Sequence, residues 1–288
     1  MLDNEKITLL TAGIKKKKEL RHITDDFVRE QLFAYLRQEH KLFRSLQENF
    51  HLKSKSYEIV IKQVRARLRK AYGLFRDDPA KRRGLIETLL AVPLTAPAVA
   101  QKKAIDEILS THASTKERLP IYPDLYAKIF ALTGKPGVIL DLGCGINPFS
   151  YPYMKLRKCT YLAYEINEEE IEALNRYFSL LHRKIPYFDG QASAADIQQM
   201  PKIPPADICF LFKMTDVLDK NKGHKATEEM LKRIPAKYIV VSFATKTMSG
   251  KKMTAPRRNW MEWLCKRLGY EFTILEFENE LFYVVKKG

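Results

Sequence analysis

One short stretch limits the possible folds of this chain more than any other: Val138-Ile139-Leu140-Asp141-Leu142-Gly143-Cys144-Gly145-Ile146-Asn147-Pro148. The apolar run 138–142 predicts a buried strand. Two glycines follow at once, separated by one residue, and they allow a tight turn in which a ligand lies against bare backbone. Asp141 falls at the carboxyl end of the strand, where open α/β sheets bind their ligands. The stretch therefore predicts an α/β sheet with a ligand site at its carboxyl edge.

A second acidic residue supports this interpretation. The next strand-like run, 161–164, ends in Glu165. A carboxylate in that place accepts hydrogen bonds from both hydroxyls of a ribose. Two ligands that contain a ribose fit this plan, a dinucleotide and S-adenosylmethionine.

The residues after the turn separate these two ligands. A dinucleotide site requires a third glycine at position 148, where the chain has a proline, and Pro152 follows close behind. Prolines in these places make the amino end of the next helix a poor cradle for pyrophosphate. S-adenosylmethionine has no phosphate and needs only the two glycines and the acidic pair. The sequence favours S-adenosylmethionine, and the alternatives are a nucleotide or a strand–turn–helix with incidental glycines.

From residue 138 onward, strand-like and helix-like segments alternate. We expect helices at 167–182, 224–233 and 257–268, and strands at 138–142, 160–164, 185–188, 207–212, 237–243, 271–277 and 281–286. The alternation predicts a parallel sheet with right-handed crossovers. The last two strands are so close in the chain that they must form an antiparallel hairpin. Seven strands with a terminal hairpin predict a class I S-adenosylmethionine-dependent methyltransferase domain, which is Rossmann-like and of the α/β class.

The first part of the chain has a different period. Apolar residues recur at helical spacing, most regularly between Tyr57 and Tyr72, and strand-like alternation is rare. We predict an N-terminal all-α domain of four or five helices. The expected organisation is a helical domain over residues 1–112, with a connector around 91–123, and a methyltransferase domain over residues 113–288.

Charge indicates the kind of partner. The chain has 50 Lys and Arg against 34 Asp and Glu, a net charge of +16. A surplus of this size favours a polyanionic partner, because neutralising phosphates releases counterions. Nine basic and two acidic residues fall between Lys62 and Arg83, and a further basic run covers 15–18. These clusters predict an RNA- or DNA-docking surface, with a merely solvated basic face as the alternative.

Other classes of protein are disfavoured. No apolar stretch approaches the ~20 residues that cross a bilayer, and the acidic, polar amino terminus is unlike a secretory signal. The four cysteines are scattered without metal-binding spacing, which is typical of reduced thiols in a cytoplasmic protein. We therefore expect a cytoplasmic protein with no membrane segment and no metal.

Two later segments are candidates for ligand contacts. Asp196 and Ile197 follow the third strand, where they can offer a carboxylate to the adenine amino group and an apolar side chain to its ring; a helix cap at Asp196 is an equal alternative. The segment 242–258 is a long basic loop after the fifth strand. Loops of this length in compact domains are often functional. Its basic residues can grip a nucleic-acid backbone, and Met253 can touch a base.

Four segments in the right order give the chain a resemblance to a known family. They are Ser114–Arg118, Leu140–Pro148, Pro205–Met214 and Val241–Gly250, and together they cover about residues 110–260. The chain resembles the aminoglycoside-resistance 16S ribosomal RNA guanine-N7 methyltransferases, the Arm/Rmt group. The resemblance implies that Arg118 holds the methionine carboxylate, that Lys246 and Met253 lie near the target nucleotide, and that the helical domain docks on the small ribosomal subunit.

Pattern and resemblance together define the expected sites. The cofactor set is Arg118, Asp141, Gly143, Gly145, Asn147, Glu165, Asp196, Ile197 and Lys213. The RNA-binding set is Lys15, Lys16, Lys62, Arg65, Arg69, Lys81, Arg82, Arg83, Lys246, Lys251, Lys252, Met253, Arg257 and Arg258. The expected partner is 16S ribosomal RNA in the small subunit, with the protein acting as a monomer.

The expected reaction needs no general base. Guanine N7 carries a lone pair and no proton, so positioning and exclusion of water are sufficient, and the base must be flipped out or reached in a distorted helix. We therefore predict no catalytic acid–base residue. One alternative is methylation of another RNA position, transfer RNA or protein, for which Asp216 is the one acidic candidate. The other is a non-catalytic RNA-binding or ribosome-assembly protein that retains the fold.

Overall fold

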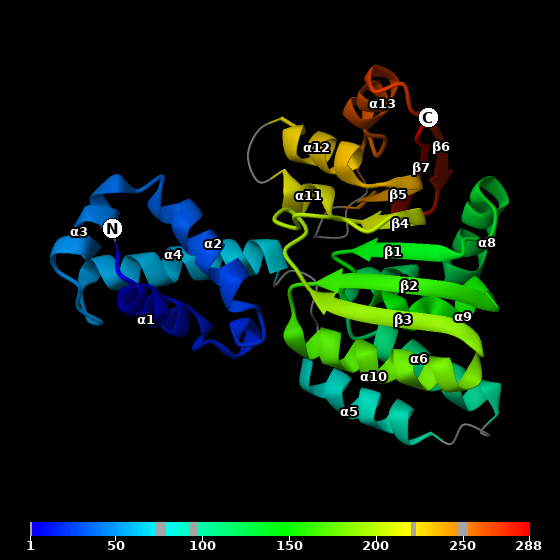
Figure 1. Cartoon of the computed structure of the whole chain (residues 1–288), viewed down its shortest axis with the longest axis horizontal. Helices are drawn as coiled ribbons and strands as arrows, with labels where there is room; N and C mark the ends of the chain where they lie inside the picture. The colour runs from blue at the N-terminus through cyan, green and yellow to red at the C-terminus, as the bar shows by residue number, and fades with distance from the viewer. Residues whose placement is uncertain (1, 73–78, 93–96, 220–222, 247–252) are drawn as a thin grey trace. The chain divides into compact units, whose positions relative to one another are not determined.

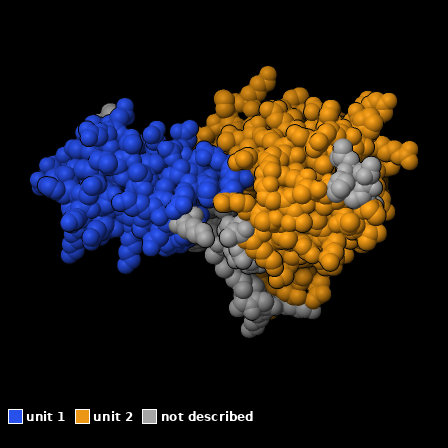
Figure 2. Space-filling model, turned by 90° about the horizontal axis from the view of Figure 1, so that it is seen from below, with its two compact units in different colours: residues 1–76, 166–169 blue, residues 77–165, 170–288 orange. Residues whose placement is uncertain are grey.

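The chain forms two compact units in a computed structural model that describes residues 2–72, 79–92, 97–219, 223–246 and 253–288. Unit 1 comprises residues 1–76 and 166–169, and unit 2 comprises residues 77–165 and 170–288 (Figures 1 and 2). Each unit has its own hydrophobic core.

Unit 1 is a small helical bundle. Its helices are α1 (Asn4–Lys15), α2 (Asp25–Leu36), α3 (His40–Glu48) and α4 (Lys55–Tyr72), with a 3-10 turn η1 (Lys18–Leu20). Asp3 begins α1 by accepting a hydrogen bond from the Lys6 amide at 2.8 Å, which satisfies one free amide of the first turn. The apolar stripe of α4 packs its fully buried Val60, Val64 and Leu68 into the core. The N-terminal helical region predicted from the sequence is thus present.

A short segment from later in the chain completes unit 1. Residues 166–169 directly follow Glu165 in the sequence. The Thr24 amide donates to the Ile166 carbonyl at 3.0 Å, and Ile23 forms an antiparallel bridge with Asn167. Ile166, which follows the predicted ribose-binding residue Glu165, is therefore hydrogen-bonded to the helical unit.

Unit 2 is built on one seven-stranded sheet. Its strands are β1 (Val138–Leu142), β2 (Lys158–Glu165), β3 (Tyr187–Ala194), β4 (Ala206–Phe212), β5 (Ala236–Ala244), β6 (Glu271–Glu276) and β7 (Glu280–Lys286). The order is β3-β2-β1-β4-β5-β7-β6, with β1 to β5 parallel and β7 antiparallel between β5 and β6. This is the predicted layout with its terminal hairpin, and the predicted fold class is confirmed.

Helices cover both faces of the sheet (Figure 1). They are α5 (Pro79–Ala91), α6 (Ala98–Leu109), α7 (Ala113–Arg118), α8 (Tyr122–Thr133), α9 (Tyr151–Met154), α10 (Glu168–Lys184), α11 (Thr215–Leu218), α12 (Lys225–Arg233) and α13 (Asn259–Arg267), with a 3-10 turn η3 (Asn147–Ser150). Alternate residues of β4 enter different cores: Phe210 packs with the cluster of α6, α8 and α10, and Leu211 with that of α12 and α13. Two buried faces explain the almost continuous apolar runs of the central strands.

The compact units divide the chain at residue 76, whereas the sequence suggested 112. Helices α5 and α6 belong to the sheet unit, because Leu89 and Ile108 lie in the same core cluster as Ile139. A helical period shows that one face is buried, but it does not show which core buries that face. The third strand also differs from the prediction of 185–188, since Gly190 and Gln191 interrupt the apolar pattern of this edge strand.

Candidate active site

Two glycines shape the turn that follows β1. Gly143 has φ of 67° and Gly145 has φ of 49°, a region that glycine enters without steric cost. A methyl group on Gly143 would overlap the Met214 side chain. The amides of Gly143 and Cys144 donate to the Tyr164 carbonyl at 2.9 and 3.1 Å. The turn is thereby held against the end of β2, and Gly143 gives the Met214 side chain room to pack against it.

Asp141 lies at the centre of a buried polar network beneath this turn. Its Oδ2 atom accepts hydrogen bonds from Asn147 Nδ2 at 2.9 Å and from the Tyr161 hydroxyl at 2.7 Å. The Tyr122 hydroxyl donates to Asn147 Oδ1 at 3.0 Å. Burial raises the pKa of Asp141 to about 6, against the two hydrogen bonds, which lower it. Asn147 therefore joins the turn to the strand that precedes it.

The predicted ribose and adenine residues meet at the ends of β2 and β3. Glu165 is buried, and its Oε2 atom accepts from the Gly145 amide at 2.9 Å. Its carbonyl accepts from the Ala195 amide at 2.9 Å, which places the Asp196 loop beside it. The carboxyl ends of neighbouring parallel strands thus bring together residues that are 31 positions apart.

The two carboxylate oxygens of Asp196 have different surroundings. Its Oδ1 atom accepts from the Gln198 amide at 3.0 Å and forms a local turn. Its Oδ2 atom is buried and has no hydrogen-bond partner among the described residues. Ile197 beside it is 5% exposed and belongs to the core. A buried carboxylate oxygen without a donor is costly, so a ligand amino group fits this position.

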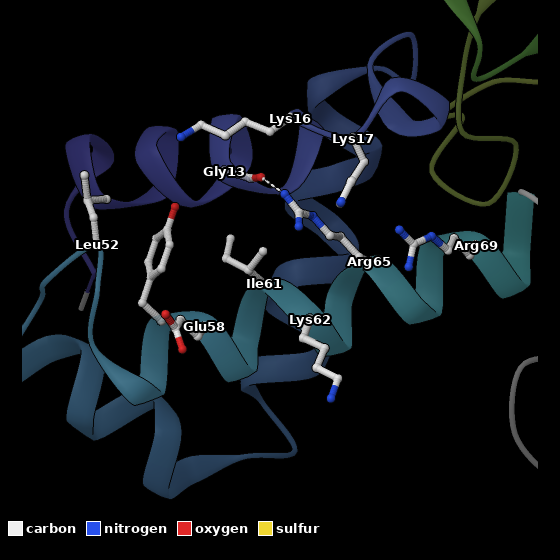
Figure 3. A pocket seen from close by; sticks show the side chains of 10 residues that line it. Gly13, Lys16, Lys17, Leu52, Glu58, Ile61, Lys62, Arg65 and Arg69 are labelled. Carbon is white, nitrogen blue, oxygen red and sulfur yellow. Dashed lines mark hydrogen bonds between the residues drawn. The ribbon is translucent and has the colours of Figure 1, made fainter.

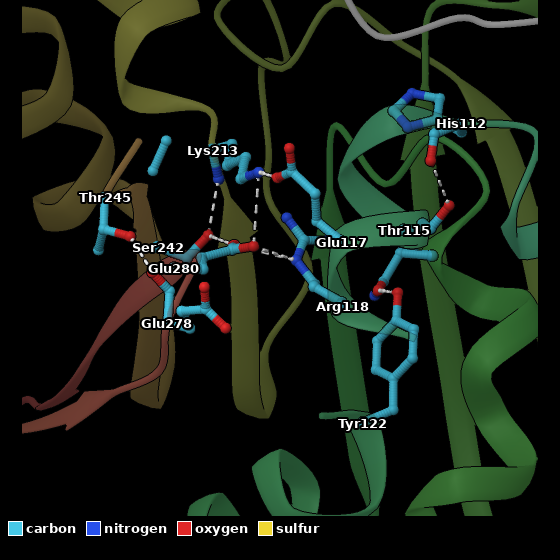
Figure 4. A network of polar contacts seen from close by, with 12 residues as sticks. His112, Thr115, Glu117, Arg118, Tyr122, Lys213, Ser242, Thr245, Glu278 and Glu280 are labelled. Atoms are coloured by element: carbon cyan, nitrogen blue, oxygen red, sulfur yellow. Dashed lines mark hydrogen bonds and ion pairs between the residues drawn. The ribbon is translucent and has the colours of Figure 1, made fainter. Parts of the chain in front are cut away.

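Arg118 and Glu280 form a buried ion pair at the same edge (Figure 4). Arg118 Nε lies 2.9 and 2.8 Å from the two carboxylate oxygens of Glu280. The guanidinium carbon lies 4.7 Å from the centre of the Phe212 ring. Ser242 Oγ donates to Glu280 Oε1 at 2.5 Å. Glu280 therefore contacts the Nε edge of the Arg118 guanidinium, and Phe212 covers one of its faces.

Lys213 is the second cation of this cluster. Its φ is 56°, a left-handed conformation that is unusual for a residue with a side chain. Its amide donates to the Ser242 hydroxyl at 3.0 Å. Its Nζ atom lies 2.6 Å from Glu117 Oε2 and 3.6 Å from Glu280 Oε2 (Figure 4). A strained, left-handed backbone at a cluster of charged side chains is typical of a functional site.

These groups fit the predicted cofactor. The site combines a tight glycine turn, the buried carboxylate of Glu165, a carboxylate oxygen of Asp196 without a partner among the described residues, and the cations Arg118 and Lys213, all at the carboxyl edge of the sheet. Such a set suits a nucleoside with an amino-acid tail. Within the residues that the structure describes, no three His, Cys, Asp or Glu side chains are grouped to bind a metal.

Comparison with known proteins identifies the family. A family model described as "Ribosomal RNA methyltransferase (FmrO)" matches residues 43–284, which is most of the 288-residue chain. The chain belongs to this family. The predicted resemblance is confirmed, and this ribosomal RNA methyltransferase uses S-adenosylmethionine as its methyl donor.

Individual relatives agree with the family match. This chain is 28% identical over 233 residues to the "16S rRNA (guanine(1405)-N(7))-methyltransferase" of Frankia casuarinae. The alignment covers 79% of this chain and 80% of the relative. It is 28% identical over 239 residues to the protein of the same name from Proteus mirabilis, spanning 78% and 83%. The solved structure of RmtF in complex with S-adenosyl-L-homocysteine matches with a TM-score of 0.76 and 22% identity over the full length of both chains. RmtB matches with a TM-score of 0.70, 22% identity and 98% of both chains.

Several of the expected RNA-binding residues line a hollow in unit 1 (Figure 3). The hollow has a volume of about 530 Å³ and is lined by Gly13, Lys16, Lys17, Leu52, Tyr57, Glu58, Ile61, Lys62, Arg65 and Arg69. Lys16 and Lys62 are exposed. Arg65 instead donates to the Gly13 and Ile14 carbonyls at 2.6 and 3.1 Å, at the end of α1.

Two other members of this group are in ion pairs within unit 1. Arg69 Nη2 lies 2.7 Å from a Glu19 oxygen, and Lys15 Nζ lies 2.5 Å from Asp25. Both are surface pairs with at least one partner about half exposed. Such surface pairs contribute little to stability.

Arg82 is buried, so its predicted role in binding RNA is wrong. Its side chain is 5% exposed, and its Nη1 atom lies 2.5 Å from Glu170, which is equally buried. Its Nε and Nη2 atoms donate to Thr111 Oγ1 at 2.8 Å and the Thr111 carbonyl at 2.9 Å. A guanidinium committed to these partners joins α5 to α10 inside unit 2. Lys81 and Arg83 flank it and are exposed.

The loop after β5 is partly described. Lys246 Nζ lies 2.9 Å from Glu278 Oε1, and the Met253 amide donates to the Thr245 carbonyl at 2.9 Å. Arg257 is exposed and lies 2.9 Å from Glu262. Arg258 donates to the Ala244 carbonyl at 3.1 Å and lies over the Phe243 ring. Lys251 and Lys252 lie outside the described residues.

Sequence reasoning missed four members of the site. Glu280, Ser242, Tyr122 and Tyr161 carry the hydrogen bonds that orient Arg118, Lys213, Asn147 and Asp141. Glu280 was assigned to a hairpin turn, although a carboxylate beside the apolar run 281–285 was a signal that it needed a buried partner. The two tyrosines had the pattern of ordinary core residues.

Proposed function

We propose that this ribosomal RNA methyltransferase modifies guanine N7 in the decoding-site (A-site) RNA of the small ribosomal subunit, and that the modification confers aminoglycoside resistance. The main support is that relatives from Frankia casuarinae and Proteus mirabilis, aligned over about four fifths of this chain, are both named 16S rRNA (guanine(1405)-N(7))-methyltransferases. We further propose that the enzyme is a cytoplasmic monomer.

The proposed cofactor contacts follow the site from one end to the other. Arg118 and Lys213 bind the carboxylate of the methionine tail, because they form the cationic corner. Gly143, Gly145 and Asn147 shape the turn against which the donor lies, with Asp141 beneath it. Glu165 binds the ribose, and Asp196 with Ile197 binds the adenine, with Asp196 Oδ2 accepting from its amino group.

The proposed transfer depends on position. S-adenosylmethionine supplies an electrophilic methyl group, and guanine N7 supplies a lone pair with no proton to remove. The chain therefore needs to hold the donor still, keep water out and align the acceptor. The buried network around Asp141 and the ion pair of Arg118 with Glu280 hold the donor-binding side chains in fixed positions.

The proposed docking surface includes the hollow of unit 1. The exposed Lys16, Lys17 and Lys62 supply positive charge there. The exposed Lys81 and Arg83 and the loop residues Lys246, Met253, Arg257 and Arg258 complete the set. Contacts of this kind position an RNA backbone without reading its sequence.

A transfer assay tests this function. Purified enzyme with labelled S-adenosylmethionine is offered intact small subunits, naked 16S RNA, transfer RNA and ribosomal protein in parallel. We expect the most label on intact small subunits, because the docking surface recognises folded RNA. Glu165→Ala is the matched control and removes the label. Transfer to transfer RNA or protein alone would refute the proposal.

A further inference from the structure

Glu280 is a buried carboxylate on which three side chains converge (Figure 4). It is the first residue of β7, it pairs with Ala244 of β5, and it is fully buried. A carboxylate removed from water in this way is costly unless cations and donors surround it. Arg118, Lys213 and Ser242 are those partners.

The contacts divide the donors of Arg118 into two groups. Glu280 engages the Nε–H of the guanidinium through both carboxylate oxygens, and the Phe212 ring covers one face. A guanidinium has five N–H donors in a rigid fork. Gripping the Nε edge orients the terminal amino groups without engaging them in the Glu280 contact.

Ser242 links Lys213 to Glu280 by hydrogen bonds. Its hydroxyl accepts from the Lys213 amide at 3.0 Å and donates to Glu280 at 2.5 Å. The left-handed backbone of Lys213 is thereby tied to the carboxylate. Two cations share this one buried carboxylate, and Glu117, which also pairs with Lys213, is 46% exposed. The corner is therefore suited to a second, incoming carboxylate.

We propose that Glu280 is a positioning residue for the methyl donor, which fixes Arg118 and Lys213 so that they meet the α-carboxylate of its methionine tail. This rests on the proposed role of Arg118 as the carboxylate ligand. Glu280 touches neither the methyl group nor the acceptor; it acts through the two cations.

A purely structural role makes a different prediction. If Glu280 only held α7 against β5 and β7, its loss would weaken every ligand of the site alike. If it positions the carboxylate ligands, its loss weakens only ligands that carry the aminocarboxylate tail. S-adenosylhomocysteine has this tail, and 5′-methylthioadenosine has the same adenosine and thioether without it.

Calorimetry with these two ligands tests the proposal. For Glu280→Gln we expect the Kd of S-adenosylhomocysteine to rise about ten- to a hundredfold, and that of 5′-methylthioadenosine to stay within about threefold. Glu271→Gln is the matched control and should change neither Kd. Glu271 lies on β6, is exposed, and forms an ion pair with Lys286 of β7. Equal weakening of both ligands, or no weakening, overturns the proposal.

Two further variants keep the outcome decisive. Arg118→Ala should abolish the preference for S-adenosylhomocysteine; if the preference survives, the proposed role of Arg118 fails, and this inference fails with it. If Arg118→Ala loses the preference and Glu280→Gln keeps it, the inference alone fails. Should Glu280→Gln not fold, Ser242→Ala removes one contact of Glu280 and should reduce the preference several-fold, and an unchanged preference overturns the inference.

Discussion

At the scale of single residues, the site is built from polar groups that are unusually deeply buried. Asp141, Asn147, Arg118 and Glu280 are each at most 2% exposed, and each has a hydrogen-bonding partner within the network. Such groups hold one geometry because every alternative leaves a charge or donor unsatisfied. They also make the protein's stability depend on pH.

Asp141 provides a test of this dependence. Its pKa is raised by burial to about 6, so the ionised carboxylate destabilises the folded state above that pH, and acidification toward pH 4 removes the penalty. Asp141→Asn has no such charge and keeps an acceptor for Tyr161 and Asn147. We expect its unfolding free energy, relative to the parent, to be higher at pH 7 than at pH 4 by up to about 3 kcal/mol. Chemical denaturation at both pH values measures the difference, and a pH-independent difference would contradict the raised pKa.

The glycine turn provides a second test at this scale. Gly143→Ala places a side chain at positive φ and against Met214, so it should reduce stability by about 1–2 kcal/mol and weaken S-adenosylhomocysteine binding at least about tenfold. Gly269 also has positive φ, at 71°, but open space around it. Gly269→Ala should lower the melting temperature and leave the Kd unchanged. Equal Kd values for the two variants would show that the turn does not contact the donor.

At the scale of elements, the sequence predicted the strands well where both faces are buried. The bounds of β1 agree with the prediction, those of β4 and β7 differ by one residue at one end, and those of β5 differ by one residue at each end. A continuous apolar run marks these strands, which are buried on both faces. The edge strand β3 was misplaced because polar residues and Gly190 interrupt it. Asp141, Glu165 and the two glycines were found because they share one local motif. Glu280 was missed because its partner Arg118 is 162 positions away in the chain.

Arg82 tests how α5 is joined to the sheet unit. Removing one partner of a buried ion pair leaves the other charge uncompensated, so Arg82→Ala should lower the unfolding free energy by about 3–5 kcal/mol. Lys81→Ala and Arg83→Ala change exposed residues on the same helix and should stay within about 0.5 kcal/mol of the parent. Denaturant unfolding compares the three. If Arg82→Ala has the stability of its neighbours, the buried pair with Glu170 is not what holds the helix.

At the scale of the whole molecule, a basic chain presents its charge from two units. The helical unit carries the hollow lined by Lys16, Lys17 and Lys62, and the sheet unit carries the proposed methyl-donor site and the loop after β5. No helix among the described stretches has the length and apolarity to cross a bilayer. Because the hollow and the proposed donor site lie in different units, we expect mutations to affect RNA docking and methyl transfer separately.

A paired charge reversal tests the separation. Lys16→Glu with Lys62→Glu should weaken binding to small subunits by roughly tenfold or more, flatten the salt dependence of that binding, and leave the Kd of S-adenosylhomocysteine unchanged. Lys135→Glu with Lys158→Glu alters net charge equally, at exposed positions near the amino ends of β1 and β2. If both pairs weaken binding alike, net charge rather than the hollow determines docking.

The most direct measurement is the position of the methyl group on the RNA. Small subunits treated with the enzyme and S-adenosylmethionine are reduced, cleaved with aniline and examined by primer extension across the decoding site. We expect one enzyme-dependent stop at a decoding-site guanine, lost with Glu165→Ala, because N7 methylation makes that nucleotide sensitive to cleavage. Methyl transfer without such a stop, or a stop elsewhere in the RNA, would contradict the assignment of guanine N7 in the decoding site.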